Sequence, residues 1–452
     1  MTAPDSIQLA QSSVMTSGSG IPSRRRVLSR LIGLPLAVSF GGSQLAACGG
    51  SEAPATLDLT EDARKPRPTP TPTPAPSEPT PNTLPANTVD VVGVTALHAA
   101  LDNANATGGN VTLRLADGIY DVQRTLQVNA ANIAIVSQSG RRSAVVLQGD
   151  AMSSSAAIKN VIRVAASAFT LKSVTVQRCG WHTVQIAGES NADTPNLIDC
   201  VFRDSWEQLV KISTTSPPSS TIFCDGGIVD SCLFEYSAGI GPQYYIAGID
   251  GHNCRNWVVR ASTFKYIASP SQQVAEQAVH FWGTANITVD RNVFIDCDRA
   301  IQFGLGTSRS VDGGVIRNNF IYHGNNGHPF ADVGISLESS PNVTVANNTV
   351  FQEHAYPRAI EFRFAGTTGG TIANNLTNRA ISSRDGGTAT LRTNHSAATA
   401  AMFVQASSGN LRLAYAVPGV VDSGTTLSAV TVDIDGRSRP RGSAFDIGGH
   451  EF

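Results

Sequence analysis

Short apolar runs separated by turns rich in Asn, Asp and Gly recur through residues 165–395. Runs of this length, rich in Val and Ile and bounded by turn formers, are typical of β-strands. Each unit carries an apolar landmark, and successive landmarks stand 26 to 32 residues apart, at positions 202, 234, 264, 294, 320, 350 and 376. The pattern therefore predicts one structural unit that repeats about every thirty residues.

Each unit also contains a second short strand in which apolar and polar residues alternate, so one face points inward and the other outward. These strands lie at residues 184–186, 210–212, 249–252, 279–282, 301–303, 335–338, 360–363 and 381–384. A β-propeller blade needs about forty residues and four strands, and leucine-rich repeats need Leu spacings that are absent here. The sequence thus predicts an all-β fold, a parallel β-helix in which every repeat forms one coil.

The ends of the repeat region fit this architecture. Residues 95–102 form a convincing amphipathic helix, which we expect to cap the open edge of the first coil, and residues 111–120 follow as a first-coil strand. With its Asn-rich turns, the pattern resembles the right-handed β-helix proteins of the pectate-lyase-like class over residues 90–452. The resemblance implies that residues 89–452 form one domain, a single-stranded right-handed parallel β-helix, or solenoid, with an N-terminal capping helix.

The tail, residues 433–451, resembles the closing motif of many anchored β-helix proteins. Asp433 and Asp435 within it have two interpretations. They are calcium ligands, or they belong to a turn closed by Asx hydrogen bonds, which is the simpler explanation. We expect no other cofactor and no metal site.

An export signal is predicted at the N-terminus. Residues 23–28, Ser-Arg-Arg-Arg-Val-Leu, precede an apolar stretch at 31–40 that is too short and too broken to span a membrane. The Ser-Arg-Arg-x-x-Leu pattern resembles a twin-arginine signal, and residues 45–49 resemble a bacterial lipobox. The resemblance implies a signal peptide at residues 1–47 and a lipid on Cys48.

Such a lipid would make the protein an exported, membrane-anchored lipoprotein of the periplasm, outer membrane or cell surface. A simple secretory signal with a chance cysteine is the alternative. Residues 48–88 follow as a linker, dominated by a Pro-Thr run at 66–74 that continues to Pro85. Such a run extends as a semi-rigid spacer of roughly 3 Å per residue, since it forms neither ladders nor a core.

Composition narrows the function. Hydrophobic residues make up 41% of the chain, charged residues 15%, and the net charge is -2. These values exclude a protein that coats nucleic acid, a wholly disordered chain and a polytopic membrane protein. We expect a monomer that binds no nucleic acid.

Six cysteines remain beyond Cys48, at positions 179, 200, 224, 232, 254 and 297. An even number in an exported protein permits disulfides. Cys200 and Cys232 each stand two residues before a Phe, however, which favours buried thiols stacked on one another.

Equivalent strand positions stack roughly 4.8 Å apart in a β-helix, so the outward positions of the second strand line one face. The first outward position reads Gln185, Lys211, Asp250, His280, Gln302, Ser336, Glu361 and Ser382, and the position two residues on reads Ala187, Ser213, His252, Trp282, Gly304, Glu338, Arg363 and Arg384. A solvated face would carry Thr, Ser, Asn and Gln, whereas the middle coils gather titratable groups and an indole. We interpret the face as a groove for a polysaccharide chain.

The candidate catalytic residues of this groove are Lys211, Tyr245, Asp250, His252, His280, Glu361 and Arg363. The candidate substrate-binding residues are Trp282, as a stacking platform, Gln302, Glu338 and Arg384.

One segment of the groove carries a closer resemblance. Residues 244–253 are similar to the Tyr-x-x-Asp-Pro-His segment of mannuronan epimerases, which share this fold and abstract the proton at carbon five of a uronate. The resemblance implies that Asp250 and His252 are catalytic and that Tyr245 donates or accepts a proton. Gly251 replaces the Pro of that segment, and Tyr245 precedes Asp250 by five residues rather than three.

The groove contains the groups needed for uronate lysis or epimerisation, which are a base, a cation that neutralises the carboxylate, and an acid. Lys211, His252 and His280 are candidate bases, and Lys211 or Arg363 is the candidate cation. Tyr245 or a second His delivers the proton. The leading hypothesis is a lyase or epimerase that acts on an acidic polysaccharide.

Two alternatives remain open. A non-catalytic carbohydrate-binding or adhesive surface lipoprotein would use the groove for docking alone. An inverting glycoside hydrolase needs two carboxyls about 6.5–9.5 Å apart, whereas Asp250 and Glu361 stand four coils, roughly 19 Å, apart. Hydrolysis would require an acid from a turn, such as Asp296 or Asp298.

Overall fold

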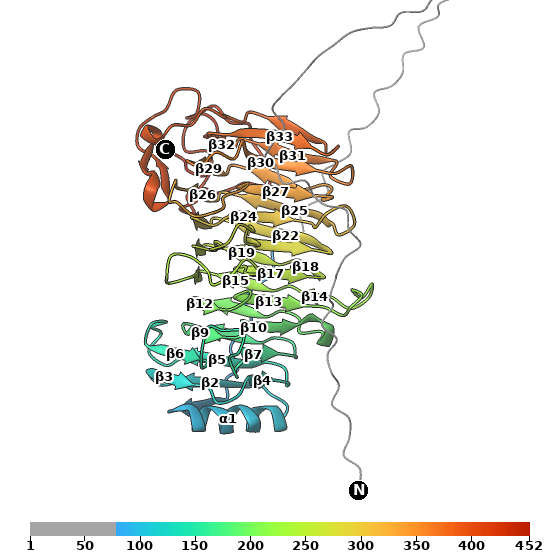
Figure 1. The fold of residues 1–452 in the computed structure, drawn as a ribbon, viewed down its shortest axis with the longest axis vertical. Helices are drawn as coiled ribbons and strands as arrows, with labels where there is room; N and C mark the ends of the chain where they lie inside the picture. Colours follow the sequence, from blue (N-terminus) through green and yellow to red (C-terminus); the bar gives the residue numbers. More distant parts are fainter. Residues whose placement is uncertain (1–77) are drawn as a thin grey trace, which may run out of the picture. The chain divides into compact units, whose positions relative to one another are not determined.

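Each repeat contributes strands to three stacked parallel sheets in the computed structural model, which describes residues 78–452 (Figure 1). These residues belong to one unit of the chain, Pro72–Phe452. The predicted signal peptide, the lipidation site Cys48 and the linker up to residue 77 lie outside the described residues. Within residues 78–452, no helix is long and apolar enough to cross a membrane.

We name the three sheets the broad sheet, the groove sheet and the Phe sheet. The broad sheet has 14 strands: β1 (Thr88–Val91), β2 (Val111–Leu115), β5 (Ile133–Ser137), β8 (Thr170–Lys172), β11 (Asn196–Ile198), β14 (Cys224–Asp225), β15 (Ile228–Asp230), β18 (Cys254–Arg255), β19 (Val258–Arg260), β22 (Thr284–Asp290), β25 (Val311–Arg317), β28 (Thr344–Ala346), β31 (Gly370–Ala373) and β34 (Ala389–Arg392).

The groove sheet has 10 strands: β4 (Leu126–Val128), β7 (Asn160–Val164), β10 (His182–Ala187), β13 (Val210–Ser213), β17 (Ile249–His252), β21 (Gln277–Trp282), β24 (Arg299–Phe303), β27 (Ile335–Glu338), β30 (Arg358–Arg363) and β33 (Ala380–Arg384). The Phe sheet also has 10: β3 (Gly118–Asp121), β6 (Val145–Gln148), β9 (Thr175–Cys179), β12 (Val201–Ser205), β16 (Leu233–Glu235), β20 (Thr263–Lys265), β23 (Val293–Ile295), β26 (Phe320–His323), β29 (Thr349–Gln352) and β32 (Leu376–Thr377). In each of these three sheets, neighbouring strands come from successive coils, as predicted for a parallel β-helix.

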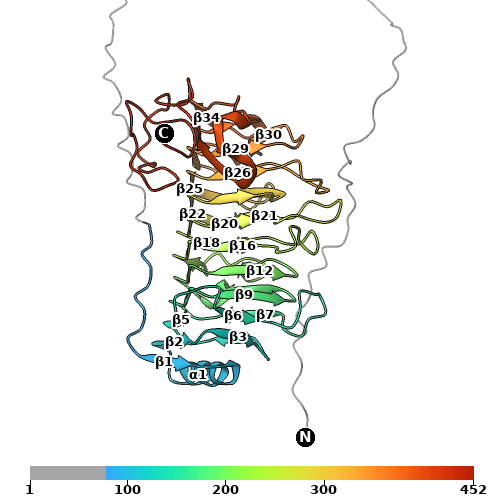
Figure 2. The same ribbon diagram turned by 90° about the vertical axis from the view of Figure 1, so that its left-hand side faces the viewer.

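The capping helix is α1 (Val94–Ala106), which lies across the end of the stack beside β1 and β2 (Figures 1 and 2). Leu97 and Leu101 on its inner face are buried against the first coil. A helix in this position covers strand edges that would otherwise pair with another chain. The predicted first-coil strand at 111–120 is two strands, β2 and β3, with a turn between them.

Aromatic rings stack through the interior of the Phe sheet. Phe202, Phe234, Phe264 and Phe294 are in register from coil to coil, and adjacent rings have centroids 4.6 to 5.0 Å apart. Offset stacking of this kind stabilises beyond the area that it buries. The thirty-residue spacing of landmarks is therefore the spacing of one stacked column.

The predicted column is wrong by one residue at two of its landmarks. Ile321, not Phe320, pairs with Phe294, and Thr377, not Leu376, pairs with Val350. Phe320 and Leu376 belong instead to a second apolar cluster outside the coil, which the C-terminal residues cover. These strands carry apolar residues on both faces, so their sequence shows no alternation of apolar and polar positions. Without that alternation the inward position cannot be identified, and an error of one residue exchanges the two faces of the strand.

At the turn between the broad sheet and the Phe sheet, equivalent side chains of successive coils form a column, and each is hydrogen-bonded to the next coil. The Oδ1 of Asn319 accepts hydrogen bonds from the backbone N–H and the side-chain amide of Asn292, at 2.9 and 3.0 Å. Cys232 and Cys200 continue this column, and the Cys200 N–H lies 3.4 Å from the Cys232 Sγ. All six cysteines after residue 78 are buried free thiols, so the interpretation as stacked thiols is confirmed.

The C-terminal residues fold back along the outside of the last coils. They include the short antiparallel pair β35 (Phe403–Gln405) and β36 (Asn410–Leu413). Asp433 Oδ1 accepts backbone N–H groups from Asp435 and Arg437, at 2.9 and 2.8 Å. The Asx turn predicted for this segment is thus present, and the Asp435 carboxylate is also engaged by Arg412.

The end of the predicted linker packs on the β-helix. Glu78 forms an ion pair with Arg317 at 2.7 Å, and the Asn82 amide donates to the Thr194 carbonyl at 2.8 Å. Residues 78–87 are therefore part of the folded unit and not a spacer. The charged and amide side chains among the prolines provide these contacts.

Candidate functional site

The groove sheet carries the predicted face in the predicted register. Strand pairing aligns the first outward position from Gln185 through Lys211, Asp250, His280, Gln302, Ser336 and Glu361 to Ser382. At the second position, His252 pairs with Trp282 and Glu338 pairs with Arg363. Because parallel strands repeat without a break, side chains far apart in sequence lie in one row.

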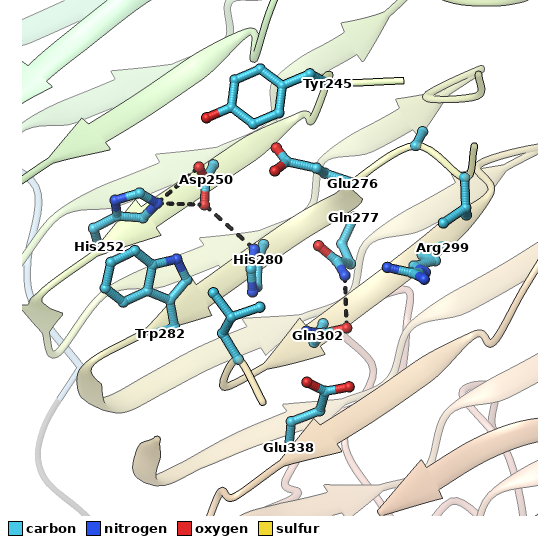
Figure 3. Close-up of a pocket in the computed structure, with 13 residues that line it drawn as sticks. Tyr245, Asp250, His252, Glu276, Gln277, His280, Trp282, Arg299, Gln302 and Glu338 are labelled. Carbon is cyan, nitrogen blue, oxygen red and sulfur yellow. Dashed lines mark hydrogen bonds and ion pairs between the residues drawn. The ribbon is translucent and has the colours of Figure 1, made fainter. Parts of the chain in front are cut away.

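Lys211, Asp250 and His252 form a close triad at the centre of the row. The Lys211 ammonium donates to Asp250, and it lies 2.9 Å from His252 Nε2. His252 Nε2 also lies 2.9 and 3.0 Å from the two Asp250 oxygens (Figure 3). The charge of Lys211 is balanced inside the triad.

Burial and charge set the protonation of the triad. Burial by itself would raise the pKa of Asp250, but His252 and Lys211 beside it hold that pKa well below its usual value. Burial, opposed by the Asp250 carboxylate, lowers the pKa of His252 to about 4. At neutral pH the site therefore holds an ionised Asp250 and a neutral His252.

His280 follows Asp250 on the next coil. Its Nδ1 lies 3.4 Å from Asp250 Oδ1, and its Nε2 lies 3.2 Å from the Gly304 carbonyl. Gln302, one coil further, accepts from the Gln277 amide at 2.7 Å and donates to the same carbonyl. These contacts fix the orientation of both side chains.

The row is more deeply buried than a solvated strand face would be. Asp250, His280 and Gln302 are each less than 5% exposed. A cavity of about 330 Å³ opens above them, and Val274, Ala275 and Leu305 from the flanking loops line its walls. The strand pattern could not show these loops, which convert an open face into a pocket.

Glu276 is a cavity residue that the sequence analysis missed. It precedes β21, and its Oε2 accepts a 2.7 Å hydrogen bond from the buried Gln208 amide. Burial, reinforced by the charge of Asp250, raises the pKa of Glu276 to about 7. Its carboxyl thus exchanges a proton near neutral pH, while Asp250 stays ionised.

The loop that carries Glu276 is held from below by Asp298. Asp298 Oδ2 accepts the backbone N–H groups of Ser269 and Ala275, at 3.0 and 2.9 Å. Asp296 similarly accepts the Gly324 N–H at 2.8 Å. Neither Asp296 nor Asp298 lines the cavity, so the acid contributed by a turn is Glu276 and not one of these two.

Tyr245 lines the cavity, with its hydroxyl on the side of Asp250 (Figure 3). It is 41% exposed. Burial of the ring edge and the nearby carboxylates raise its pKa above the usual range of a phenol. Tyr245 is therefore a neutral hydroxyl that a substrate in the cavity would contact.

Trp282 forms the floor beside the triad. Its ring lies 3.9 Å from the His252 ring between centroids, and the Arg309 guanidinium lies over it at 4.1 Å. No carboxylate of residues 78–452 lies within 4.0 Å of the Arg309 nitrogens, so its charge is available to an anion. The sequence analysis missed Arg309 because it comes from a loop outside the strand register.

The remaining predicted residues form a separate charge network. Arg363 bonds Glu338 at 2.7 Å and Asp385 at 2.8 Å, and Arg384 lies 3.3 Å from Glu361. Glu361 also accepts a 2.9 Å hydrogen bond from the Tyr356 hydroxyl. We call these residues the Arg network.

The Arg network lies apart from the cavity. Of its members only Glu338 lines the cavity, where its Oε2 accepts the Gly306 N–H at 2.7 Å. Glu361, Arg363 and Arg384 do not line it. The catalytic roles predicted for Glu361 and Arg363 therefore have no support in this geometry, because their charges are already paired.

Comparisons with known proteins agree with this fold. The sequence matches the right-handed β-helix region family over residues 160–413. No curated protein sequence matches the chain significantly. Its fold is similar to that of pectate lyase Pel9A, with a TM-score of 0.54 and 14% identity over 77% of this chain and 90% of that one.

Two further solved structures are less similar. A polygalacturonase from Erwinia carotovora ssp. carotovora has a TM-score of 0.41 and 13% identity, covering 71% of this chain and 96% of the other. A mannuronic acid specific polysaccharide family 6 lyase from human gut microbiota has a TM-score of 0.41 and 13% identity, covering 68% and 80%. Identities this low show a shared architecture only. With the family match over more than half of its length, this chain belongs to the right-handed β-helix family.

Proposed function

We propose that the cavity of the groove sheet binds a uronate unit of an acidic polysaccharide and removes the proton next to its carboxylate, as a lyase or an epimerase. One observation carries the proposal. The cavity combines a carboxyl that titrates near neutral pH, Glu276, with a neutral phenol, Tyr245, and the unpaired Arg309 guanidinium lies over Trp282, which lines the same cavity. Pectate lyase Pel9A, whose fold is similar, is a pectate lyase by name.

Each of these groups answers one requirement of the chemistry. The proton on a carbon beside a carboxylate is removable only when the charge of that carboxylate is neutralised, and Arg309 supplies a planar cation for this purpose. Trp282, only 6% exposed, lies against the Arg309 guanidinium and holds it in place through a cation–π contact. Substrate would therefore lie along the row with its carboxylate toward Arg309.

Proton transfer follows from the protonation states. The Glu276 carboxylate takes the proton from carbon, because a base whose pKa lies near the working pH is the most effective one. In elimination the C–H electron pair forms the new carbon–carbon double bond, the glycosidic C–O bond breaks, and the Tyr245 hydroxyl protonates the leaving oxygen. In epimerisation the C–O bond stays intact, the Tyr245 hydroxyl delivers a different proton to the opposite face of the same carbon, and the proton on Glu276 passes to solvent as Tyr245 is reprotonated from it.

The Lys211–Asp250–His252 triad holds the sugar in place. An ionised Asp250 accepts hydrogen bonds from sugar hydroxyls, and His252 packs on Trp282 at the same level. The triad is thus proposed as the binding and orienting part of the site, with His280 and Gln302 extending it along the chain direction.

A glycoside hydrolase is the second candidate, and one observation favours it. Asp250 and Glu276 line one cavity with pKa values displaced in opposite directions, which is the arrangement of an ionised carboxylate and a protonated acid. The same residues would then cleave the glycosidic bond with water.

The purified protein should be incubated with a panel of polyuronates, including pectate and polymannuronate. Ultraviolet absorbance of an unsaturated sugar identifies a lyase, and exchange of solvent deuterium into the polymer without absorbance identifies an epimerase. New reducing ends without absorbance identify a hydrolase. Binding without any of these products would overturn the enzymatic proposal and leave a carbohydrate-binding protein.

We further propose that the protein is exported and anchored by lipid on Cys48, on the strength of the Ser23–Leu28 and Leu45–Gly49 patterns. Metabolic labelling with a fatty-acid analogue checks this. Label and membrane association should both disappear in Cys48→Ala. A labelled Cys48→Ala protein would contradict the anchor.

A further inference from the structure

Asp298, His323 and His328 meet where successive coils turn from the Phe sheet to the groove sheet. Asp298 precedes β24, His323 ends β26, and His328 lies in the loop that follows. One ligand atom from each of the three lies within 4.8 Å of the other two. None of the three residues lines the groove cavity, so this cluster is separate from the proposed active site.

Each member of the cluster holds a buried polar atom without a hydrogen-bond partner. These atoms are Asp298 Oδ1, His323 Nε2 and His328 Nδ1. Asp298 is fully buried, and His323 is only 3% exposed. Burying acceptors without a donor is unfavourable, and unsatisfied groups of this kind in one place indicate a missing partner.

In Asp298 and His323, the second polar atom of the side chain is hydrogen-bonded to the backbone, which orients the atom that has no partner. Asp298 Oδ2 already accepts two backbone N–H groups. His323 Nδ1 lies 2.8 Å from the Gly324 carbonyl and donates to it, which leaves the lone pair on Nε2. Histidine ligands of metals are held by this same carbonyl contact, which fixes the tautomer and the ring plane.

A third histidine nearby has a different role. His354 packs edge to face on His323, with centroids 4.7 Å apart. Its Nδ1 accepts the Tyr356 N–H at 3.2 Å, so in the neutral ring the hydrogen is on Nε2. His354 therefore supports the His323 ring and offers no lone pair to the cluster.

We propose that Asp298, His323 and His328 bind a divalent transition-metal ion of the zinc class. Two imidazole nitrogens and one carboxylate oxygen suit zinc, cobalt or nickel, and water would complete a tetrahedral shell. Calcium prefers six to eight oxygen ligands, which this cluster does not provide. The half-buried His328 lies beside the exposed residues 325–327, which gives an ion a way in.

The ion would be structural. Asp298 would link it to the loop 269–275, because its second oxygen holds the backbone of that loop. His328 would link it to the loop after β26, whose end is tied to Asp298 by the Asp332 N–H at 2.8 Å. The metal would thus brace the loop that ends at Glu276, one wall of the groove cavity.

Cobalt(II) titration of chelator-treated protein tests the site without any polysaccharide, so its result is independent of the proposed enzyme activity. We expect visible absorption of a tetrahedral cobalt complex that saturates at one ion per chain and disappears when zinc is added. His328→Ala should weaken cobalt binding by about a hundredfold or more, since one of three protein ligands is lost. Because His328 is half-buried in a loop, this variant should fold, and circular dichroism confirms it.

His252→Ala is the matched control, because it removes a histidine of the groove triad. It should bind cobalt as the unmodified protein does, and His323→Ala should lose binding as His328→Ala does. Hydrogen exchange of the 269–275 amides should slow when zinc is bound. Absence of saturable binding, equal binding in His328→Ala, or loss of binding in His252→Ala would each overturn the proposal.

Discussion

The cavity and the Arg network lie on one sheet and meet at Glu338, and their charged groups differ in how many partners they have. In the Arg network each of Glu338, Glu361 and Arg363 has at least two partners, so each of these three charged groups is paired. In the cavity, Glu276 has one amide donor and a pKa of about 7, and Arg309 has the ring of a cavity residue, Trp282, as its side-chain contact. Charged groups that are paired with one another stabilise a coil, whereas charged groups without an ion-pair partner beside a cavity are available to bind a ligand.

The same substitution in both regions gives the sharpest contrast. Glu276→Gln should lower turnover of the polyuronate substrate by about 100-fold to 10,000-fold, because the proposed base is lost. Glu361→Gln should leave turnover within a few-fold, since its carboxylate does not line the cavity. Steady-state kinetics of both variants measure the difference, and an equal loss in Glu361→Gln would mean that the two regions act as one site.

Asp250→Asn should be the most destabilising change in the row. It leaves the Lys211 ammonium, only 11% exposed, without its counter-charge, which costs about 3–5 kcal/mol. Urea unfolding at neutral pH measures the free energy of unfolding. The double variant Lys211→Met/Asp250→Asn should recover most of the loss, and failure to recover would show that the pair is not the source.

The matching change in the Arg network should cost less. Arg363→Met leaves Glu338 bonded to the Gly306 N–H and Glu361 bonded to Tyr356 and Arg384. The expected loss is about 1–3 kcal/mol, because each carboxylate retains a donor. If Arg363→Met lowered the free energy of unfolding as much as Asp250→Asn does, then having several partners would not protect the charged groups of the Arg network.

Glu276 should make the protein less stable as pH rises. An ordinary ion-paired carboxylate has the opposite effect, because its pKa is lowered in the folded state. Its folded pKa of about 7 lies above the unfolded value, so the folded state binds more protons between the two values. Its contribution to stability is full at acid pH and is lost as pH rises toward 7. Glu276→Gln should therefore stabilise the protein at pH 8 and change little at pH 4.

Glu361→Gln should show no gain in stability at pH 8, and this variant serves as the control for the pH series. Thermal unfolding at several pH values measures both variants. A stabilising effect of Glu276→Gln that is equal at both pH values would contradict the raised pKa.

The smallest expected effect concerns a pair of guanidinium–aromatic contacts, one beside the cavity and one in the Arg network. Arg309 lies over Trp282, which lines the cavity, whereas Arg363 over Phe364, at 4.6 Å, belongs to the Arg network. Arg309→Ala should weaken binding of a uronate oligosaccharide about tenfold, while Phe364→Ala should not change it. Calorimetric titration measures the affinity, and equal affinities would exclude Arg309 as the carboxylate partner.

Local pattern was enough to predict the architecture because stacked coils repeat one spacing. The row from Gln185 to Ser382 is in the expected register throughout, since inward and outward residues alternate cleanly on the groove sheet. The Phe sheet was misaligned at Phe320 and Leu376, where the C-terminal residues bury a second face. Alternation identifies a face only when the other face is solvated.

Apart from Tyr245, which the resemblance of residues 244–253 singled out, the site was predictable only where it lies on strands. Asp250, His252, His280 and Trp282 were found from their strand positions, and the cavity includes all four. Glu276 and Arg309 lie in loops with no repeat, so no periodic signal marked them. The cluster of Asp298, His323 and His328 was also hidden, because its members come from a turn, a strand end and a loop.

The amino-acid sequence by itself determined the coil, its period and the row of polar side chains, because each depends on contacts between equivalent positions one repeat apart. The tertiary structure alone decided which members of that row share a cavity and which are neutralised by neighbours. Protonation depends on the distance to every nearby charge and on the loss of water, and loops of irregular length set both.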